Sequence, residues 1–209
     1  MRVPVKLNDC EVIHDNAMND VGDLIHFALL ANFVPVNYKE ALKSDVWKRV
    51  MIEELQSIKK KKTWELVNLL DKKNKIDVKW VFKAKLNPDG QVFKHKARIV
   101  ASGFLQKHGI YYNEVFAPVA RIETMRLVID IAYKNDWELY HLDVKSSFLN
   151  GPIEKLVFVA QPPGFKIAGK ENMVSKLHKA LYGLKQAPRA LNKRIDLFLI
   201  HIGFKKCSV

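Results

Sequence analysis

Cysteine is nearly absent from this sequence, which contains only Cys10 and Cys207 among its 209 residues. The two thiols stand near opposite ends of the chain and do not form a pair with the spacing of a zinc site. The seven histidines are scattered and form no ligand pattern. This usage argues against a disulfide framework and a metal knuckle, so we expect no disulfide partner. It predicts reduced thiols in an intracellular compartment, the cytoplasm or the nucleus.

The sequence also lacks a long apolar run. Its most apolar early stretch, residues 27–36, is interrupted by Asn32 and Pro35, and it is far shorter than the about 20 residues that cross a bilayer. The N-terminus has no apolar core typical of a signal peptide. We therefore expect a protein that is neither secreted nor embedded in a membrane.

Acidic residues are scarce relative to basic ones. Lys and Arg number 35 against 22 Asp and Glu, which gives a formal net charge of +13. Such a balance favours a polyanionic partner, most often nucleic acid. Charge alone leaves open the alternative of a basic protein with no such partner.

The order of the expected helices and strands predicts an α+β fold, because no regular strand–helix repeat is present. Residues 1–37 have weak periodicity and several turn formers, and we interpret them as a partly disordered arm or linker. Apolar stripes at helical spacing predict three helices. The expected elements are a helix over 44–58 (Trp47, Val50, Met51, Leu55, Ile58), a hairpin over 78–100, a helix over 120–133 (Ile122, Met125, Ile129, Ala132), strands over 137–144 and 157–159, and a helix over 188–203 (Leu191, Ile195, Phe198, Ile202).

The hairpin is the clearest local signal. Two alternating stretches, 78–86 and 91–100, flank an Asn-Pro-Asp-Gly turn at 87–90. Alternation places the apolar side chains on one face and the cations on the other. The cationic face would hold Lys83, Lys85, Lys94, Lys96 and Arg98. Because like charges repel, an anionic ligand is favoured over a merely solvated sheet face, which is the alternative.

Six strings in order add a resemblance to a known family. They are KWVFK at 79–83, KARIVA at 96–101, FAPVAR at 116–121, LDVKSSFLNG at 142–151, QPPGF at 161–165 and KALYGLKQAPR at 179–189. Together they resemble the reverse transcriptase of Ty1/copia-type retrotransposons, especially the plant elements. The resemblance implies a partial right-hand polymerase fold over 38–209, with fingers at about 38–136 and the start of the palm at about 137–209. Residues 1–37 would then connect integrase to reverse transcriptase.

The resemblance also implies roles for individual residues. Asp143 would be the first catalytic aspartate and a ligand of Mg²⁺, although an aspartate at a strand end is usually a turn former. The backbone amides of Ser146 and Ser147 would face a deoxynucleoside triphosphate, and Phe148 would exclude a 2′-hydroxyl. Lys83 and Arg98 would clamp the phosphates, and Tyr182 and Gly183 would shape the nucleotide pocket. An RNA template and a DNA primer would contact the basic residues Lys85, Lys94, Lys96, Lys185 and Arg189.

One part of the family pattern is missing. The 209 residues contain no Asp-Asp dipeptide, so the Tyr-x-Asp-Asp motif of the family is absent. Because two-metal catalysis needs several bridging carboxylates, we expect a fragment of an RNA-directed DNA polymerase that is inactive alone. Smaller departures from the pattern occur at Ser147, Lys155, Leu191 and Asn192. The alternatives are a non-catalytic basic module that binds nucleic acid and a relic that does not fold stably.

Overall fold

The computed structural model describes residues 34–87 and 91–206. The predicted helix over 44–58 is confirmed as α3 (Asp45–Lys60), and it follows a short helix, α2 (Tyr38–Ala41), which the sequence did not predict. The side chain of Asn37 caps α2 by accepting hydrogen bonds from the backbone N–H groups of Lys39 and Glu40. The predicted stripe of α3 is buried at Trp47, Met51 and Ile58.

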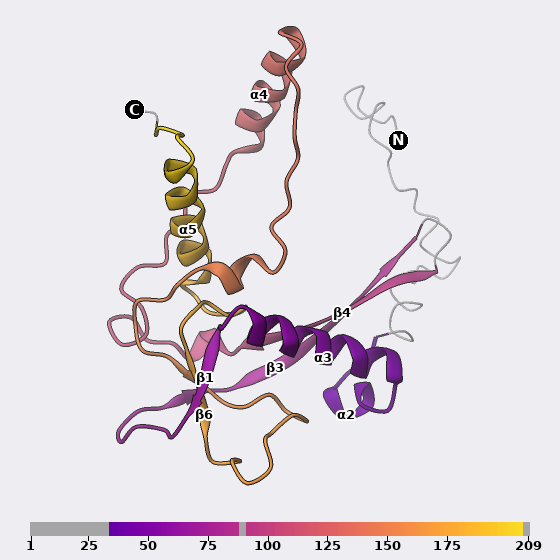
Figure 1. The fold of residues 1–209 in the computed structure, drawn as a ribbon, viewed down its shortest axis with the longest axis vertical. Helices are drawn as coiled ribbons and strands as arrows, with labels where there is room; N and C mark the ends of the chain where they lie inside the picture. Colours follow the sequence, from indigo (N-terminus) through magenta and orange to yellow (C-terminus); the bar gives the residue numbers. More distant parts are fainter. Residues whose placement is uncertain (1–33, 88–90, 207–209) are drawn as a thin grey trace, which may run out of the picture.

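The predicted hairpin is also confirmed. Strands β3 (Val78–Leu86) and β4 (Val92–Ala101) pair antiparallel, with a register shift between Lys85 and Leu86. Its apolar face is buried at Trp80, Ala97 and Ile99 and packs with α3, which crosses the hairpin in Figure 1. Most of the predicted turn, residues 88–90, lies outside the described residues.

A second sheet lies beside the hairpin and has the strand order β1-β6-β5-β2. Its strands are β1 (Trp64–Val67), β2 (Lys75–Ile76), β5 (Phe158–Val159) and β6 (Val174–Leu177). Only β5 was predicted. The β2 and β5 strands are parallel, whereas β6 pairs antiparallel with both β1 and β5. The sheet therefore joins segments about a hundred residues apart in the sequence.

A single cluster of buried side chains connects the two sheets. It combines residues of α3, both hairpin strands, β6, and the 3₁₀ helix η4 (Ser147–Asn150). The loop over 161–165 packs against the same cluster, and its carbonyl at Pro163 accepts a 2.9 Å hydrogen bond from the indole Nε1 of Trp80. A second 3₁₀ helix, η3 (Gly103–Leu105), follows β4. The core thus fixes the end of β4, η4 and the segment around residue 182 relative to one another.

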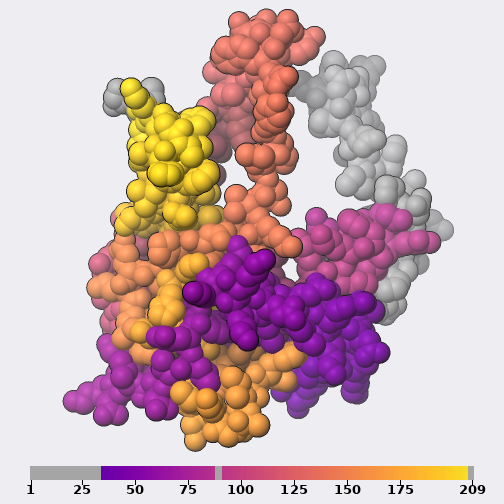
Figure 2. All heavy atoms as spheres, viewed as in Figure 1, coloured from indigo at the N-terminus to yellow at the C-terminus, as the bar shows by residue number. Residues whose placement is uncertain are grey.

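Two helices stand away from this body. In Figures 1 and 2, α4 (Ile122–Lys134) and α5 (Ala187–His201) each project from it without packing on a sheet. Both helices were predicted, and most side chains of their apolar stripes are exposed. Ala132 is the one buried residue of α4, and α5 buries only Ala187 and Ala190 near its start. Near its start α5 packs against η4 and Gly151, whereas the rest of its stripe and most of the α4 stripe are exposed.

The predicted strand over 137–144 is wrong. The segment has no regular secondary structure, and its large apolar side chains, among them Trp137, Tyr140 and Leu142, are exposed. An apolar segment forms a strand only where another strand supplies hydrogen bonds, and none of the described strands pairs with this segment.

The molecule is a mixed α and β fold with small sheets, as the predicted α+β class requires. The assignment of fingers and palm remains a prediction. The boundary between arm and domain at residue 38 also remains a prediction, because all but four residues of the expected arm lie outside the described part. One of those four, Val34, packs against the core. No helix of the described residues is long and apolar enough to cross a membrane.

Candidate active site

The cationic face of the hairpin has the composition that the alternation predicted. Lys83 stands directly opposite Lys96, and Lys85 opposite Lys94, so like charges face each other across the strands. The pKa of Lys96 is lowered, first by burial and then by the positive charges of Arg98, Lys85 and Lys94. The folded chain therefore holds unfavourable positive charge on this face, which an anion would relieve.

Arg98 turns from this face toward Tyr182. The Tyr182 segment lies along the free edge of β4, where the backbone N–H of Ala101 donates a 2.8 Å hydrogen bond to the carbonyl of Tyr182. The guanidinium carbon of Arg98 lies 4.9 Å from the centroid of the Tyr182 ring, within cation–π range. Burial is the main reason that the pKa of the Tyr182 hydroxyl is raised, and the positive charge of Arg98 opposes this effect.

Phe148 completes an aromatic pair with Tyr182. Their ring centroids are 5.2 Å apart and the planes meet at 71°, an edge-to-face arrangement that fixes both rings. In the loop before Phe148, the backbone of Ser146 is left-handed at φ 52°. Its Oγ lies 3.5 Å from the Oγ of Ser57 on α3, and Ser147 hydrogen-bonds to the Tyr182 side chain. The structure thus brings together Arg98, Ser146, Ser147, Phe148 and Tyr182, which we call the aromatic–arginine cluster.

Asp143 is exposed and lies in the extended segment, not at the end of a strand as predicted. Its negative charge nevertheless acts on Lys96 and opposes the lowering of that lysine's pKa. The carboxylate is therefore within electrostatic reach of the cationic face. Across residues 34–87 and 91–206, no group of three or more His, Cys, Asp and Glu side chains could together hold a metal ion.

Lys185 and Arg189 lie outside the aromatic–arginine cluster. The ammonium of Lys185 donates to the carbonyl of Gln106 at 3.1 Å and lies 5.7 Å from the ring centroid of Tyr112. Arg189 donates from Nη1 to the carbonyl of Phe116 at 2.9 Å. These two predicted nucleic-acid contacts therefore belong to a separate surface beside the start of α5.

Gly183 has a packing role that its predicted pocket role did not include. Its φ is +87°, and a Cβ at this position would meet the carbonyl oxygen of Ala101 and, at 2.6 Å, a methyl group of Val100. Only glycine allows both the backbone conformation and the close approach. Gly183 thereby lets the Tyr182 segment lie against β4.

Glu54 is a residue near the cluster that sequence reasoning missed. Its Oε1 is buried and has no hydrogen-bond partner among the described residues. Burial raises the pKa of the Glu54 carboxyl, while a hydrogen bond from the backbone of Ile99 and the charge of Arg98 act in the opposite direction. The sequence spacing could have indicated that Glu54 is buried, because it falls three residues after Met51 and four before Ile58 and so shares their face of α3.

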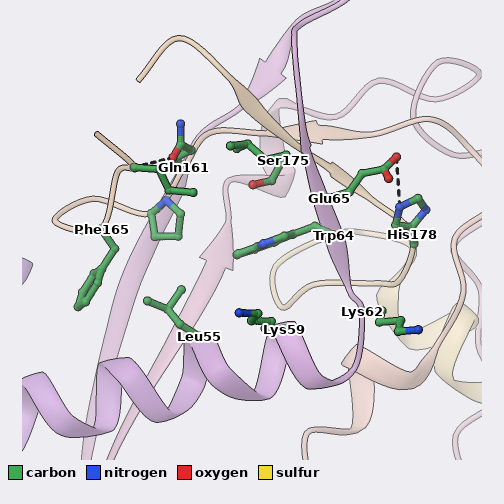
Figure 3. A pocket seen from close by; sticks show the side chains of 12 residues that line it. Leu55, Lys59, Lys62, Trp64, Glu65, Gln161, Phe165, Ser175 and His178 are labelled. Carbon is green, nitrogen blue, oxygen red and sulfur yellow. Dashed lines mark hydrogen bonds and ion pairs between the residues drawn. The ribbon is translucent and has the colours of Figure 1, made fainter. Parts of the chain in front are cut away.

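A separate cavity of about 670 Å³ lies between the C-terminal half of α3 and the second sheet (Figure 3). Leu55 and Lys59 of α3 point into it, opposite Trp64, and Phe165 closes one side. At its edge the Nε2 of His178 lies 3.4 Å from Oε1 of Glu65. None of the residues predicted for catalysis or nucleotide binding lines this cavity, so it is distinct from the aromatic–arginine cluster.

Comparison with known proteins relates the chain to reverse transcriptases. Residues 61–209 match the family described as reverse transcriptase (RNA-dependent DNA polymerase). The chain is 44% identical over 151 residues to the retrovirus-related Pol polyprotein from transposon TNT 1-94 of Nicotiana tabacum, covering 72% of this chain and 11% of that protein. It is 39% identical over 178 residues to the Pol polyprotein from transposon RE1 of Arabidopsis thaliana, covering 85% of this chain and 12% of that protein.

A shorter relative is the uncharacterized mitochondrial protein AtMg00820 of Arabidopsis thaliana, with 45% identity over 92 residues, 44% of this chain and 54% of that protein. No solved structure matches the chain significantly. The chain spans about a tenth of the length of the Pol polyproteins. On the extent of the family match, this chain belongs to the reverse transcriptase (RNA-dependent DNA polymerase) family and is homologous to the Pol polyproteins of plant copia-type retrotransposons.

Proposed function

We propose that the chain is the nucleotide-holding part of an RNA-directed DNA polymerase of a copia-type retrotransposon, and that its 209 residues do not polymerise DNA alone. The observation that carries the proposal is the arrangement of cations on the hairpin, where Lys83 stands opposite Lys96 and Lys85 opposite Lys94. Arg98 is held beside them against Tyr182, and the charge of Asp143 acts on Lys96. A triphosphate placed there would neutralise the cations, and Asp143 would lie beside it.

Each residue of the site has a task in this proposal. Lys83 and Arg98 bind the phosphates, with Arg98 already oriented by its contact with Tyr182. The backbone N–H groups of Ser146 and Ser147 add fixed dipoles toward the phosphates. Phe148 lies under the sugar, where its ring is held by Tyr182 and leaves no space for a 2′-hydroxyl. RNA template and DNA primer lie along the remaining basic residues.

The donor set fits Mg²⁺ only in part. Mg²⁺ is commonly bound through one or two carboxylates together with substrate phosphates and water, and exposed Asp143 can supply one such carboxylate. When bound, the ion would neutralise charge on the phosphates. A two-metal centre needs further bridging carboxylates, and the described residues bring no such group together. This shortage supports the expectation that the chain alone is inactive.

The test is titration of the 209-residue chain with dATP and with ATP, each with Mg²⁺, by calorimetry. Arg98→Ala should weaken dATP binding about 10- to 100-fold, the value of a charge-assisted hydrogen bond of about 1.5–3 kcal/mol. Phe148→Ala should reduce the preference for dATP over ATP. Lys48→Ala, which removes an exposed cation from α3, is the control and should bind as wild type. Absence of dATP binding at low salt would overturn the nucleotide site.

Primer extension on an RNA template tests the second half of the proposal. We expect no product from the chain alone at any Mg²⁺ concentration. If the wild-type chain extends the primer and Asp143→Asn does not, the inferred inactivity is refuted and the proposed role of Asp143 is supported.

A second candidate function is a non-catalytic module that binds nucleic acid, favoured by the five cations on one hairpin face. It predicts salt-dependent binding of an RNA–DNA duplex without any nucleotide binding. Replacing Lys94 and Lys96 by glutamine should then reduce the slope of affinity against salt by about 0.9 for each phosphate that these lysines neutralise. An unchanged slope would exclude this alternative.

A further inference from the structure

A second basic region lies apart from the hairpin, around a cavity of about 770 Å³. Three segments form its wall: the stretch that leads into β2, the stretch after η3, and residues 155–158. The first of these follows β1, at the lower left of Figure 1. No residue of the aromatic–arginine cluster and no cation of the hairpin lines it. We call this cavity the lysine cavity.

The charge around the lysine cavity has one sign. Its lining includes no Asp or Glu, and it includes five lysines: Lys72, Lys73, Lys75, Lys107 and Lys155. Four of them are exposed and Lys155 is half-buried. The carboxylates nearest in sequence are Asp71, Asp77 and Glu154, and Glu154 is already bound by Lys193 at 2.7 Å.

None of the five ammonium groups forms a salt bridge or a side-chain hydrogen bond with a residue in the described part of the chain. The charge of Lys155 acts on Glu154 without forming an ion pair with it. Five ammonium groups around one hollow repel one another and attract an anion. A single small anion could contact only some of them, because the lysines come from three segments around a wide opening. A chain of phosphates matches their distribution better.

The lining also contains apolar side chains, which the binding of phosphate alone would not require. Leu105 and Ile110 are 51% and 58% exposed, unusually open for such side chains, and Tyr111 lies beside them. Bases of a single strand can stack on aromatic and aliphatic surfaces while the backbone meets cations. Bases inside a duplex cannot, because they are stacked on each other. The volume is within the range of about 300–1,000 Å³ of typical ligand sites, enough for a nucleotide unit.

The lysine cavity adjoins the surface beside α5. Tyr111 and Lys155 also line an adjoining cavity of about 200 Å³, whose other residues include Gln186 and Arg189. The carbonyl of Tyr111 accepts a 3.1 Å hydrogen bond from Nε2 of Gln186, which fixes the Tyr111 backbone relative to α5. The adjoining cavity is also lined by Glu114 and Glu154, so the single-sign charge is confined to the lysine cavity itself.

We propose that the lysine cavity binds a single-stranded stretch of nucleic acid, with phosphates on the five lysines and bases against Leu105, Ile110 and Tyr111. This proposal rests on the proposed function in one respect, which is that the bound strand is identified with the unpaired part of the template. Binding itself requires neither the nucleotide site nor catalysis.

The experiment measures fluorescence anisotropy of a labelled 12-nucleotide single-stranded RNA with the 209-residue chain, over a series of salt concentrations. The variant is Lys73→Gln, Lys107→Gln and Lys155→Gln together. Its slope of log affinity against log salt should be shallower by about 2, since each phosphate contact on a single strand contributes about 0.7. Affinity at low salt should fall at least tenfold.

The control variant removes the same charge elsewhere, by Lys39→Gln, Lys43→Gln and Lys48→Gln, all outside the lining and remote in sequence from the lysine cavity. It should keep the wild-type slope. A blunt duplex with the same number of phosphates should bind the lysine-cavity variant and the wild type alike. Equal reductions in both variants, or an equal reduction with duplex, would overturn the proposal and indicate unspecific attraction.

A second measurement does not depend on how the variant folds. Photo-crosslinking of 4-thiouridine RNA to the wild-type chain should label the peptide that contains residues 105–111. Labelling confined to the hairpin would overturn the proposal. Calorimetry with dATP separates the two proposals, because the lysine-cavity variant should bind dATP normally. Absence of dATP binding by the wild type would refute the nucleotide site and leave the single-strand result unaffected.

Discussion

Replacement of Gly183 by alanine tests whether the aromatic–arginine cluster is held together through the edge of β4. The new Cβ would collide with the carbonyl oxygen of Ala101 and come within 2.6 Å of Cγ1 of Val100, and the backbone would keep φ near +87°. Neither neighbour is the free end of a flexible side chain, because both belong to a core strand. The Tyr182 segment must therefore move away from β4.

The cost can be estimated from two contributions. A non-glycine residue with left-handed backbone costs about 1–2 kcal/mol. Separation from β4 also breaks the 2.8 Å hydrogen bond from Ala101 to Tyr182, and a bond of this kind contributes about 1 kcal/mol. We expect Gly183→Ala to lower the free energy of unfolding by about 2–4 kcal/mol once the steric clash is included.

The assay is urea unfolding followed by tryptophan fluorescence, with Gly169→Ala as the matched control. Gly169 has a similar φ of +74°, but a Cβ there meets nothing within 4 Å. Its replacement should cost only the backbone contribution, about 1–2 kcal/mol. Binding of dATP should weaken in Gly183→Ala and not in Gly169→Ala. Equal destabilisation of the two variants would refute the idea that Gly183 is required for close approach to β4.

Three further predictions concern charge and exposure. Burial raises the pKa of the Glu54 carboxyl above its ordinary value of 4.5, so ionisation of this group should lower the free energy of unfolding as the pH rises above that value. In urea unfolding, the free energy of unfolding of Glu54→Gln should equal that of wild type near pH 4 and exceed it at pH 7. Asp143→Asn should lower the pKa of Lys96 further, measured by NMR of ¹³C-labelled lysine; no change would show that Asp143 does not face the hairpin. Amides of α4, a helix of 13 residues with one buried side chain, should exchange hydrogen much faster than those of β4, because short isolated helices are marginal in water.

The hairpin and α3 could be predicted because their signals are local. Alternation over nine or ten residues, a turn sequence and a helical stripe each determine structure without reference to distant segments. The register observed between Lys83 and Lys96 follows from that alternation and the turn. The cationic face, and with it half of the candidate site, was therefore accessible from the sequence.

The second sheet could not be predicted in the same way. Its strands have two to four residues, too few to show a period, and β1 pairs with a partner more than a hundred positions away. The contact of Tyr182 with Arg98 has the same origin, since it depends on how the end of β4 meets a remote loop. Glu54 was visible within an apolar stripe, but only the packed structure shows that one oxygen remains unpartnered.

The segment over 137–144 shows why an apolar pattern alone does not make a strand. Five of its eight residues are apolar, yet it pairs with no described strand and Leu142 is 84% exposed. The same reasoning applies to α4, where Ile122, Met125 and Ile129 of a regular stripe are exposed. Both elements have sequences suited to burial, and the segment over 137–144 contains the carboxylate proposed for catalysis. If Asp143 is to hold a metal ion rigidly, the backbone on either side must first be ordered by contacts that the described residues do not supply. This is an independent reason, beyond the count of carboxylates, to expect no polymerisation by these residues alone.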